Sequence, residues 1–143
     1  MALVIRDANI NDVHSIWFLN LDGLGYDYPE ERTRQRVEHI LSSNDKLLVA
    51  ELDGTIAGYI HAGDYECTYA DSLKYIFALV VDESFREKGI GRTLVSVIER
   101  WAKESGASGI RLTSRTSREN AHKFYKACGY VDRNESKVFV KLF

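Results

Sequence analysis

The sequence has few cysteines, little net charge and no long apolar segment, and each shortage excludes a class of protein. Its two cysteines, Cys67 and Cys128, lie far apart, without a C-x-x-C spacing or a histidine at metal-site intervals. Neither a zinc site nor a disulfide framework is therefore expected, and we predict no metal ligands. We interpret both thiols as reduced, since free cysteine is usually a small core residue.

Charge and hydropathy narrow the class further. The formal net charge is -2 and the sequence pI is about 6.1, which argues against a nucleic-acid-binding protein, because such proteins carry a strongly basic face. No apolar run approaches the roughly 20 residues of a membrane span, and the first residues lack the features of a secretory signal. We expect a cytoplasmic chain with neither a membrane nor a nucleic-acid partner.

The composition and length of the sequence are those of one folded domain. Of its 143 residues, 45% are hydrophobic and 28% are charged, as is ordinary for a globular protein. A chain of this length buries roughly two-thirds of the surface that it exposes when unfolded. We predict a single domain over residues 1–143, with no linker, repeat or low-complexity tract.

Hydrophobic periodicity and turn residues predict the order β α α β β β α β α β, a mixed α/β (α+β) domain built on one mixed sheet. The first helix follows capping residues 9–12 and breaks at Gly23 and Gly25, and the second begins near Pro29. The pair Asp53-Gly54 joins two strands in a hairpin. The predicted strands span residues 3–6, 46–51, 55–62, 75–81, 110–113 and 137–142, and the later helices span residues 91–103 and 119–128.

The most informative stretch follows the strand at residues 75–81, a continuous apolar run that suits burial on both faces. Gly89 and Gly91 stand at the start of the next helix, where the backbone turns tightly and free N–H groups point outward. Such a helix start binds phosphate, and basic neighbours suit a pyrophosphate. The basic residues are Arg86, Lys88 and Arg92. The glycine spacing fits neither a P-loop nor a dinucleotide-binding fingerprint. The alternative to phosphate binding is a loop in which the glycines only reverse the chain and the charges are solvated.

Two segments resemble the signatures of the GNAT-type N-acetyltransferases, which depend on acetyl-CoA. The run Arg86-x-x-Gly89-x-Gly91 after a strand is similar to the acyl-CoA signature of this family. Residues 121–130 are similar to its second signature, a helix with Tyr125 near its end, followed by glycine and an aromatic residue. The resemblance covers almost the whole chain. It implies transfer of an acetyl group from acetyl-CoA to a primary amine of a small molecule or peptide by direct attack.

The resemblance also implies where the cofactor lies. The sheet would splay open between the strands at residues 75–81 and 110–113, and acetyl-CoA would occupy the resulting cleft. The implied cofactor-binding residues are Leu79, Val80, Val81, Arg86, Glu87, Lys88, Gly89, Ile90, Gly91, Arg92, Thr93 and Asn120. Asn120 is displaced by two positions from the place of a common family asparagine, where this chain has Arg118. Arg118 is either a phosphate ligand or a solvated charge.

The catalytic groups are assigned less completely. The resemblance makes Tyr125 the general acid that protonates the departing thiolate, with simple ring packing as the alternative. A base is also required, because an amine with a pKa near 10.4 is neutral in only about one molecule in 2,500 at pH 7. Family members often place a carboxylate on the central strand, but residues 75–78 contain no acid. The candidates elsewhere are Glu51, His61 and Asp64, and a water chain is the alternative.

Other functions stay open at this stage. A non-catalytic acyl-CoA-binding sensor or regulatory module would explain a formed cofactor signature without an evident base. A nucleotide or nucleic-acid binder would use the basic turn, although the low overall charge disfavours it. Acids among residues 21–31 would favour a cationic acceptor. Family members are commonly dimers, and Phe139 and Phe143 of the last predicted strand would supply an interface.

Overall fold

The structure is a computed structural model that describes residues 2–143. The chain divides into two compact units, Met1–Leu112 and Thr113–Phe143, and each is described by itself. The first unit contains a five-stranded sheet in the order β1-β2-β3-β4-β5. The strands are β1 (Leu3–Asp7), β2 (Lys46–Leu52), β3 (Thr55–Cys67), β4 (Ala70–Val81) and β5 (Ile110–Arg111). Only β5 runs parallel to its neighbour, so the expected mixed sheet is confirmed.

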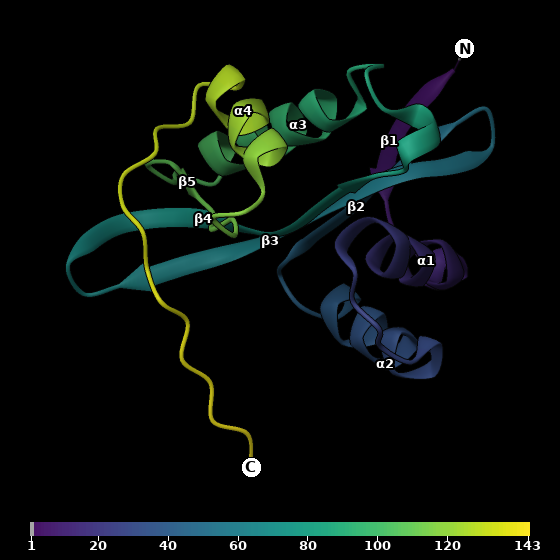
Figure 1. The fold of residues 1–143 in the computed structure, drawn as a ribbon, viewed down its shortest axis with the longest axis horizontal. Coiled ribbons are helices and arrows are strands. Elements are labelled where there is room, and N and C mark those ends of the chain that lie inside the picture. The colour runs from purple at the N-terminus through teal and green to yellow at the C-terminus, as the bar shows by residue number, and fades with distance from the viewer. Residues whose placement is uncertain (1) are drawn as a thin grey trace. The chain divides into compact units, whose positions relative to one another are not determined.

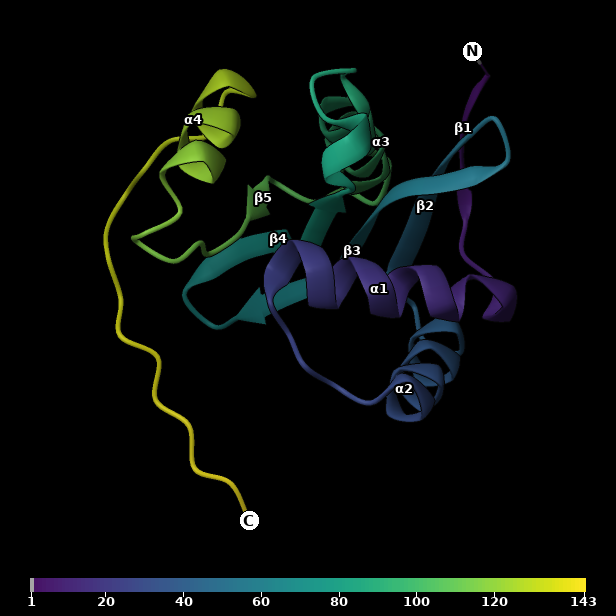
Figure 2. The same cartoon turned by 45° about the vertical axis from the view of Figure 1, so that its right-hand side comes forward.

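Helices cover both faces of this sheet (Figures 1 and 2). α1 (Val13–Leu24) and α2 (Glu30–Leu41) lie on one face, and α3 (Ile90–Glu104) lies on the other. On the first face, apolar side chains of α1 and α2 pack on Val49, Tyr59 and Val80 of the sheet. On the second face, α3 buries one apolar stripe, Ile90, Leu94, Val95, Ile98 and Ala102, as its helical spacing predicts.

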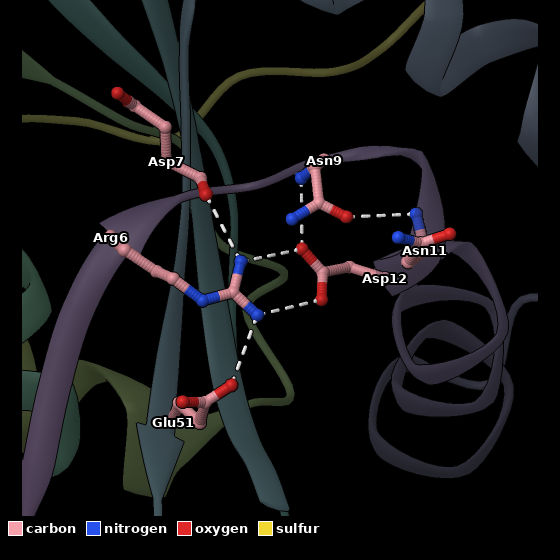
Figure 3. A network of polar contacts seen from close by, with 6 residues as sticks. All are labelled: Arg6, Asp7, Asn9, Asn11, Asp12 and Glu51. Atoms are coloured by element: carbon pink, nitrogen blue, oxygen red, sulfur yellow. Dashed lines mark hydrogen bonds and ion pairs between the residues drawn. The ribbon is translucent and has the colours of Figure 1, made fainter. Parts of the chain in front are cut away.

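A charged network fixes the start of α1 to the sheet (Figure 3). Arg6 of β1 donates to both carboxylate oxygens of Asp12, at 2.8 and 2.9 Å, and to Glu51 of β2 at 3.1 Å. The backbone N–H of Asn9 donates to the same Asp12 carboxylate, and the Asn9 side chain accepts from the N–H of Asn11. This capping box closes the short 3-10 helix η1 (Ile10–Asp12) and leads directly into α1.

α1 is longer than the sequence suggests. Gly23 lies inside the helix, so the expectation that it breaks α1 is wrong, whereas Gly25 ends the helix in the left-handed region with φ 75°. A Cβ at Gly23 would lie 2.5 Å from Cγ1 of Val80. The missing side chain therefore lets α1 pack closely against β4.

The hairpin of β3 and β4 extends beyond the predicted strands, to a turn after Cys67. The register shifts at His61, which pairs with Ala78, while Ala62 pairs with Ile76 and leaves Phe77 between the pairs. Phe77 is 54% exposed. Phe77 is the extra residue of this bulge and has no opposite partner on β3, and the prediction that this strand is buried on both faces is wrong at this residue.

The second unit contains α4 (Glu119–Ala127), which ends before Gly129 at φ 94°. The predicted strand at residues 137–142 is not formed, and β5 ends at Arg111 rather than at residue 113. A strand needs a neighbour for its N–H and C=O groups, and no described strand pairs with residues 137–142. The predicted element order is thus confirmed through α4 and wrong for the last strand.

Within residues 2–143, no helix is both long and apolar enough to cross a membrane. The same residues contain no cluster of His, Cys, Asp and Glu side chains suited to a metal ion.

Candidate functional site

The turn between β4 and α3 is held by its own backbone. The N–H of Asp82 donates to the carbonyl of Ala57 at 2.7 Å, and the Asp82 carboxylate accepts from the N–H of Ser84 at 2.9 Å. The 3-10 helix η2 (Glu83–Phe85) follows. Glu87 and Gly89 then adopt left-handed φ values of 63° and 77°, which lets the chain reverse and begin α3 within a few residues.

The start of α3 is open to a ligand. Gly89 is its N-cap and offers no side-chain cap, and a Cβ at this position would meet nothing within 4 Å. The first N–H groups of a helix have no partner within the helix and carry a partial positive charge. Arg86 and Lys88 are exposed beside them and form no ion pair with any described residue. The geometry therefore suits a phosphate or pyrophosphate group.

The edge of β4 next to this turn lacks a neighbouring strand. Pairing with β5 is confined to Lys74 with Ile110 and Tyr75 with Arg111. From Ile76 to Val81, no described strand pairs with this edge. β4 and β5 therefore pair over only two residues each, as expected for a sheet that opens between them. The unpaired backbone groups of β4 can hydrogen-bond an extended ligand in the way that an added strand does.

An aromatic row lies along β3 and β4. The rings of Tyr65 and Tyr75 stack at 5.8 Å, those of Tyr75 and Phe77 lie 5.1 Å apart, and those of Phe77 and His61 lie 4.8 Å apart. A cavity of about 380 Å³ is lined by Asp64, Tyr65, Tyr75 and Phe77. The guanidinium of Arg111 lies 5.1 Å from the ring centre of Tyr65. This surface can hold an apolar or cationic group against ring faces.

His61 has a defined carboxylate partner at one end of this row. Its Nε2 lies 2.9 Å from Oδ2 of Asp45, and the His61 side chain is only 16% exposed. A Cβ at Gly63 would lie 2.5 Å from Oδ1 of Asp45 and 3.0 Å from Phe77, so the glycine makes room for both. The sequence does not predict Asp45 as a site residue, because it precedes β2 in a loop and no sequence pattern links it to His61.

His61 also lines a second cavity, of about 150 Å³, between α1, α2 and the sheet. Tyr59 and Asn20 line it too, and the Tyr59 hydroxyl donates to the Asn20 side-chain oxygen. Burial, with a further contribution from Tyr26, raises the pKa of Tyr59 well above its usual range. The Tyr59 hydroxyl therefore stays protonated and neutral at physiological pH.

The other two base candidates, Glu51 and Asp64, are paired with cations. Glu51 lies 3.1 Å from the Arg6 guanidinium within the network at the start of α1. Asp64 accepts from the ammonium of Lys74, which itself lies 4.3 Å from the ring centre of Trp101. Both carboxylates are therefore already engaged in ion pairs with side chains of their own unit.

In the second unit, Tyr125 packs among aromatic rings of its own segment. Its ring lies 5.2 Å from that of Phe124 and 5.8 Å from that of Tyr130. Burial raises the pKa of Tyr125 above 10.0; Arg118 opposes this effect and Cys128 adds to it. Tyr125 therefore holds its proton at neutral pH. Arg118 and Asn120 are exposed at the start of α4, where the Arg118 side chain makes no capping bond.

The fold is a mixed sheet with helices on both faces, and the open start of α3 after β4 suits a phosphate-bearing group. The sequence profile of the acetyltransferase (GNAT) family matches residues 10–130, and the chain belongs to this family. The co-substrate of the family is acetyl-CoA, so the chain is an acetyl-CoA-dependent N-acetyltransferase by descent.

Individual relatives are similar over most of the chain. An N-alpha-acetyltransferase of Sulfurisphaera tokodaii is 30% identical over 136 residues, covering 90% of this chain and 80% of the relative. An aminoglycoside N(6')-acetyltransferase type 1 of Stenotrophomonas maltophilia is 23% identical and covers 66% of this chain. The chain spans only 64% of that relative.

Solved structures share the fold. AAC(6')-Iy in complex with a bisubstrate analogue superposes with a TM-score of 0.88 at 18% identity, covering 100% of both chains. A transcriptional regulator from Bacillus halodurans superposes with a TM-score of 0.87 at 23% identity, covering 98% of this chain and 100% of its own. At these identities the likeness concerns the fold and does not identify an acceptor.

Proposed function

We propose that the protein transfers the acetyl group of acetyl-CoA directly to a primary amine, with His61 as general base, Asp45 as its positioning residue and Tyr125 as general acid. One observation carries the choice of base. His61 is hydrogen-bonded to Asp45 and lines a cavity beside the aromatic row, whereas Glu51 and Asp64 are held by cations.

The cofactor fits the residues at the start of α3. Backbone N–H groups of residues 89–92 and the side chains of Arg86 and Lys88 would hold the pyrophosphate, since glycine leaves this helix start open and the first backbone N–H bonded within the helix is that of Thr93. Backbone groups of Leu79 and Val81, which point the same way along β4, would pair with the pantetheine chain. Acetyl-CoA supplies the thioester whose carbonyl carbon accepts the amine. Asn120 belongs to the proposed set on the family resemblance alone.

His61 is suited to accept a proton from the amine. Asp45, as a carboxylate, accepts from the N–H of Nε2, which leaves the lone pair of Nδ1 for the substrate. Deprotonating an unperturbed lysine-like amine at pH 7 costs about 4.6 kcal/mol, so a positioned base contributes directly to the rate. The ammonium would first give one proton to water through His61, and as the C–N bond then formed and the C–S bond broke, His61 would take the second amine proton and Tyr125 would give its proton to the departing sulfur.

The acceptor is a cationic or ring-bearing primary amine of a small molecule or peptide. The faces of Tyr75 and Phe77 offer cation–π contacts beside the cavity of about 380 Å³, and the Asp45 carboxylate lies at the same end of the row as Phe77. The names of two relatives, an N-alpha-acetyltransferase and an aminoglycoside N(6')-acetyltransferase, both describe amine acceptors. These features support a cationic amine without naming one.

The first prediction concerns the base. With acetyl-CoA and a panel of aminoglycosides, polyamines, amino acids and short peptides, release of free thiol identifies the acceptor. With that acceptor, His61→Gln lowers kcat by about 10²- to 10⁴-fold, the usual contribution of a general base. Asp45→Asn lowers kcat by a smaller factor, and Asp45→Glu restores part of it, because Asp45 acts only through His61.

The matched control is His14→Gln, which changes an exposed histidine that pairs with Glu30 and lies outside the proposed site. It leaves kcat unchanged, and all four variants keep their affinity for acetyl-CoA. A full rate in His61→Gln would contradict the assignment of the base. Binding of acetyl-CoA without thiol release from any amine would contradict the enzyme and favour a cofactor-binding module.

A further inference from the structure

The cavity of about 150 Å³ between α1, α2 and the sheet contains polar groups that the transfer step proposed above does not use. Much of its wall is apolar, with side chains from α1, α2 and β2: Ile16, Val37, Ile40 and Leu47. None of the described residues that line it is acidic. Pockets for whole ligands usually measure about 300–1,000 Å³, so this cavity suits one arm of a small ligand.

Arg36 of α2 lines this cavity and has no anionic partner. Arg34, two residues earlier on the same helix, lies 3.7 Å from Glu31, whereas the Arg36 side chain forms no ion pair or hydrogen bond with any described residue. A guanidinium stays charged at every pH at which proteins are folded. Its planar set of N–H donors matches the two oxygens of a carboxylate. The cavity wall therefore offers a cation that suits a carboxylate ligand.

Asn20 of α1 adds a second donor to the same wall. The Tyr59 hydroxyl donates to the Asn20 side-chain oxygen, and no described residue accepts from the Asn20 side-chain nitrogen. The Thr33 hydroxyl, by contrast, already donates to the carbonyl of Pro29 at 3.1 Å. A donor left without an acceptor beside an apolar wall costs free energy. An anionic group in the cavity would satisfy both Asn20 and the unpaired guanidinium.

We propose that this cavity binds a carboxylate of the acceptor, and that the acceptor is therefore an amino acid whose carboxylate contacts Arg36 and Asn20. This assignment rests on the proposed function, because it places the amine at His61, which lines the same cavity. The ring of Phe77 lies 4.8 Å from that of His61. An aromatic or basic side chain of the same amino acid would lie along the aromatic row, where ring faces bind rings and cations.

Binding is measured without turnover by calorimetric titration into the full-length protein saturated with CoA, which carries no acetyl group to transfer. The probes are the twenty common amino acids and, for each that binds, its carboxamide and its decarboxylated amine. We expect an aromatic or basic amino acid to bind, and both of its uncharged-end analogues to bind at least about 10-fold more weakly, the usual loss with a charge-assisted hydrogen bond.

Two variants assign this difference to one side chain. Arg36→Gln lowers the affinity for the amino acid about 10- to 100-fold and leaves the affinity for its carboxamide unchanged. Arg34→Gln is the matched control, because it removes the same charge from α2 at a residue that does not line the cavity, and it leaves both affinities unchanged. With acetyl-CoA, Arg36→Gln raises the KM for the amino acid and leaves kcat nearly unchanged, as expected for a residue that only binds.

The outcomes separate this inference from the proposed function. Thiol release with carboxamides or simple amines as fast as with amino acids would overturn the inference and leave the enzyme intact. Amino-acid binding that depends on Arg36, without thiol release, would contradict the proposed function and leave the carboxylate site. If no amino acid binds, or if Arg34→Gln weakens binding as much as Arg36→Gln, the site is wrong. Circular dichroism checks that both variants are folded.

Discussion

The Arg6 guanidinium donates hydrogen bonds to both Asp12 and Glu51. Its ion pair with Asp12 makes the free energy of unfolding depend on pH. Burial raises the pKa of Asp12, but hydrogen bonds from Arg6 and from the N–H of Asn9, together with the charge of Arg6, outweigh burial and lower the pKa below 3.8. A carboxyl with a lowered pKa in the folded state stabilises it above the unfolded pKa. That contribution is lost as the pH falls through the folded pKa.

Asp12→Asn is therefore expected to reduce the free energy of unfolding by about 1–3 kcal/mol at pH 7, the range for a buried charged hydrogen bond. The difference from the wild type narrows as the pH falls below about 4, where the wild-type carboxyl also gains its proton. Urea unfolding at pH 7 and pH 3 measures both. Asp71→Asn is the control, because it removes the same charge at an exposed residue. An equal loss at both pH values would refute the electrostatic account.

The choice of a general base could not be made from the sequence alone. The sequence nominates His61, Glu51 and Asp64 as equal candidates, because residue type alone does not reveal a partner. The structure separates them by partner: a carboxylate for His61 and cations for the two acids. Asp45 could not be predicted, since its role depends on the absence of a side chain at Gly63, on a different strand.

At the scale of elements, close contact between β3 and β4 depends on Gly58. A Cβ there would lie 2.6 Å from the carbonyl oxygen of Val80 and 3.2 Å from Cα of Val81. These are backbone atoms of a central strand and cannot move aside. Gly58→Ala is expected to destabilise the fold by about 1–3 kcal/mol, the usual cost of overpacking.

Thermal or urea unfolding checks this cost against Gly109→Ala, whose added Cβ meets only the Leu73 side chain, at an ordinary 3.4 Å. The control is expected to change stability little. If both variants were equally stable, close backbone approach at Gly58 would not be a requirement of the sheet.

Elements with local signals could be predicted from sequence, and elements that need a distant partner could not. The caps at Asn9 and Gly25 and the Asp53-Gly54 hairpin turn are local and are confirmed. The strands predicted at residues 55–62 and 75–81 are shorter than β3 and β4, because the turn after Cys67 contains no glycine, proline or Asp-Gly pair to mark it. Residues 137–142 have a strand pattern but no neighbour within one chain.

At the scale of the whole molecule, the proposed cofactor site and the proposed acceptor site differ in how well the sequence alone predicts them. The proposed cofactor site depends on backbone geometry that Gly89 and the helix start encode locally, so one short motif predicts it. The proposed acceptor site depends on side chains from β3, β4 and the loop before β2, which only folding brings together. This difference explains why the family follows from sequence while the acceptor does not.

The most direct test of this account is calorimetric titration of acetyl-CoA into the wild type, Gly89→Trp and Gly106→Trp. Gly89 and Gly106 flank α3, have φ values of 77° and 78°, and would place a Cβ in open space, so the two variants carry similar backbone strain. The account predicts micromolar binding to the wild type and to Gly106→Trp, and its loss in Gly89→Trp, where the indole blocks the phosphate-binding N–H groups. No binding to the folded wild type, or equal binding by both variants, would contradict it.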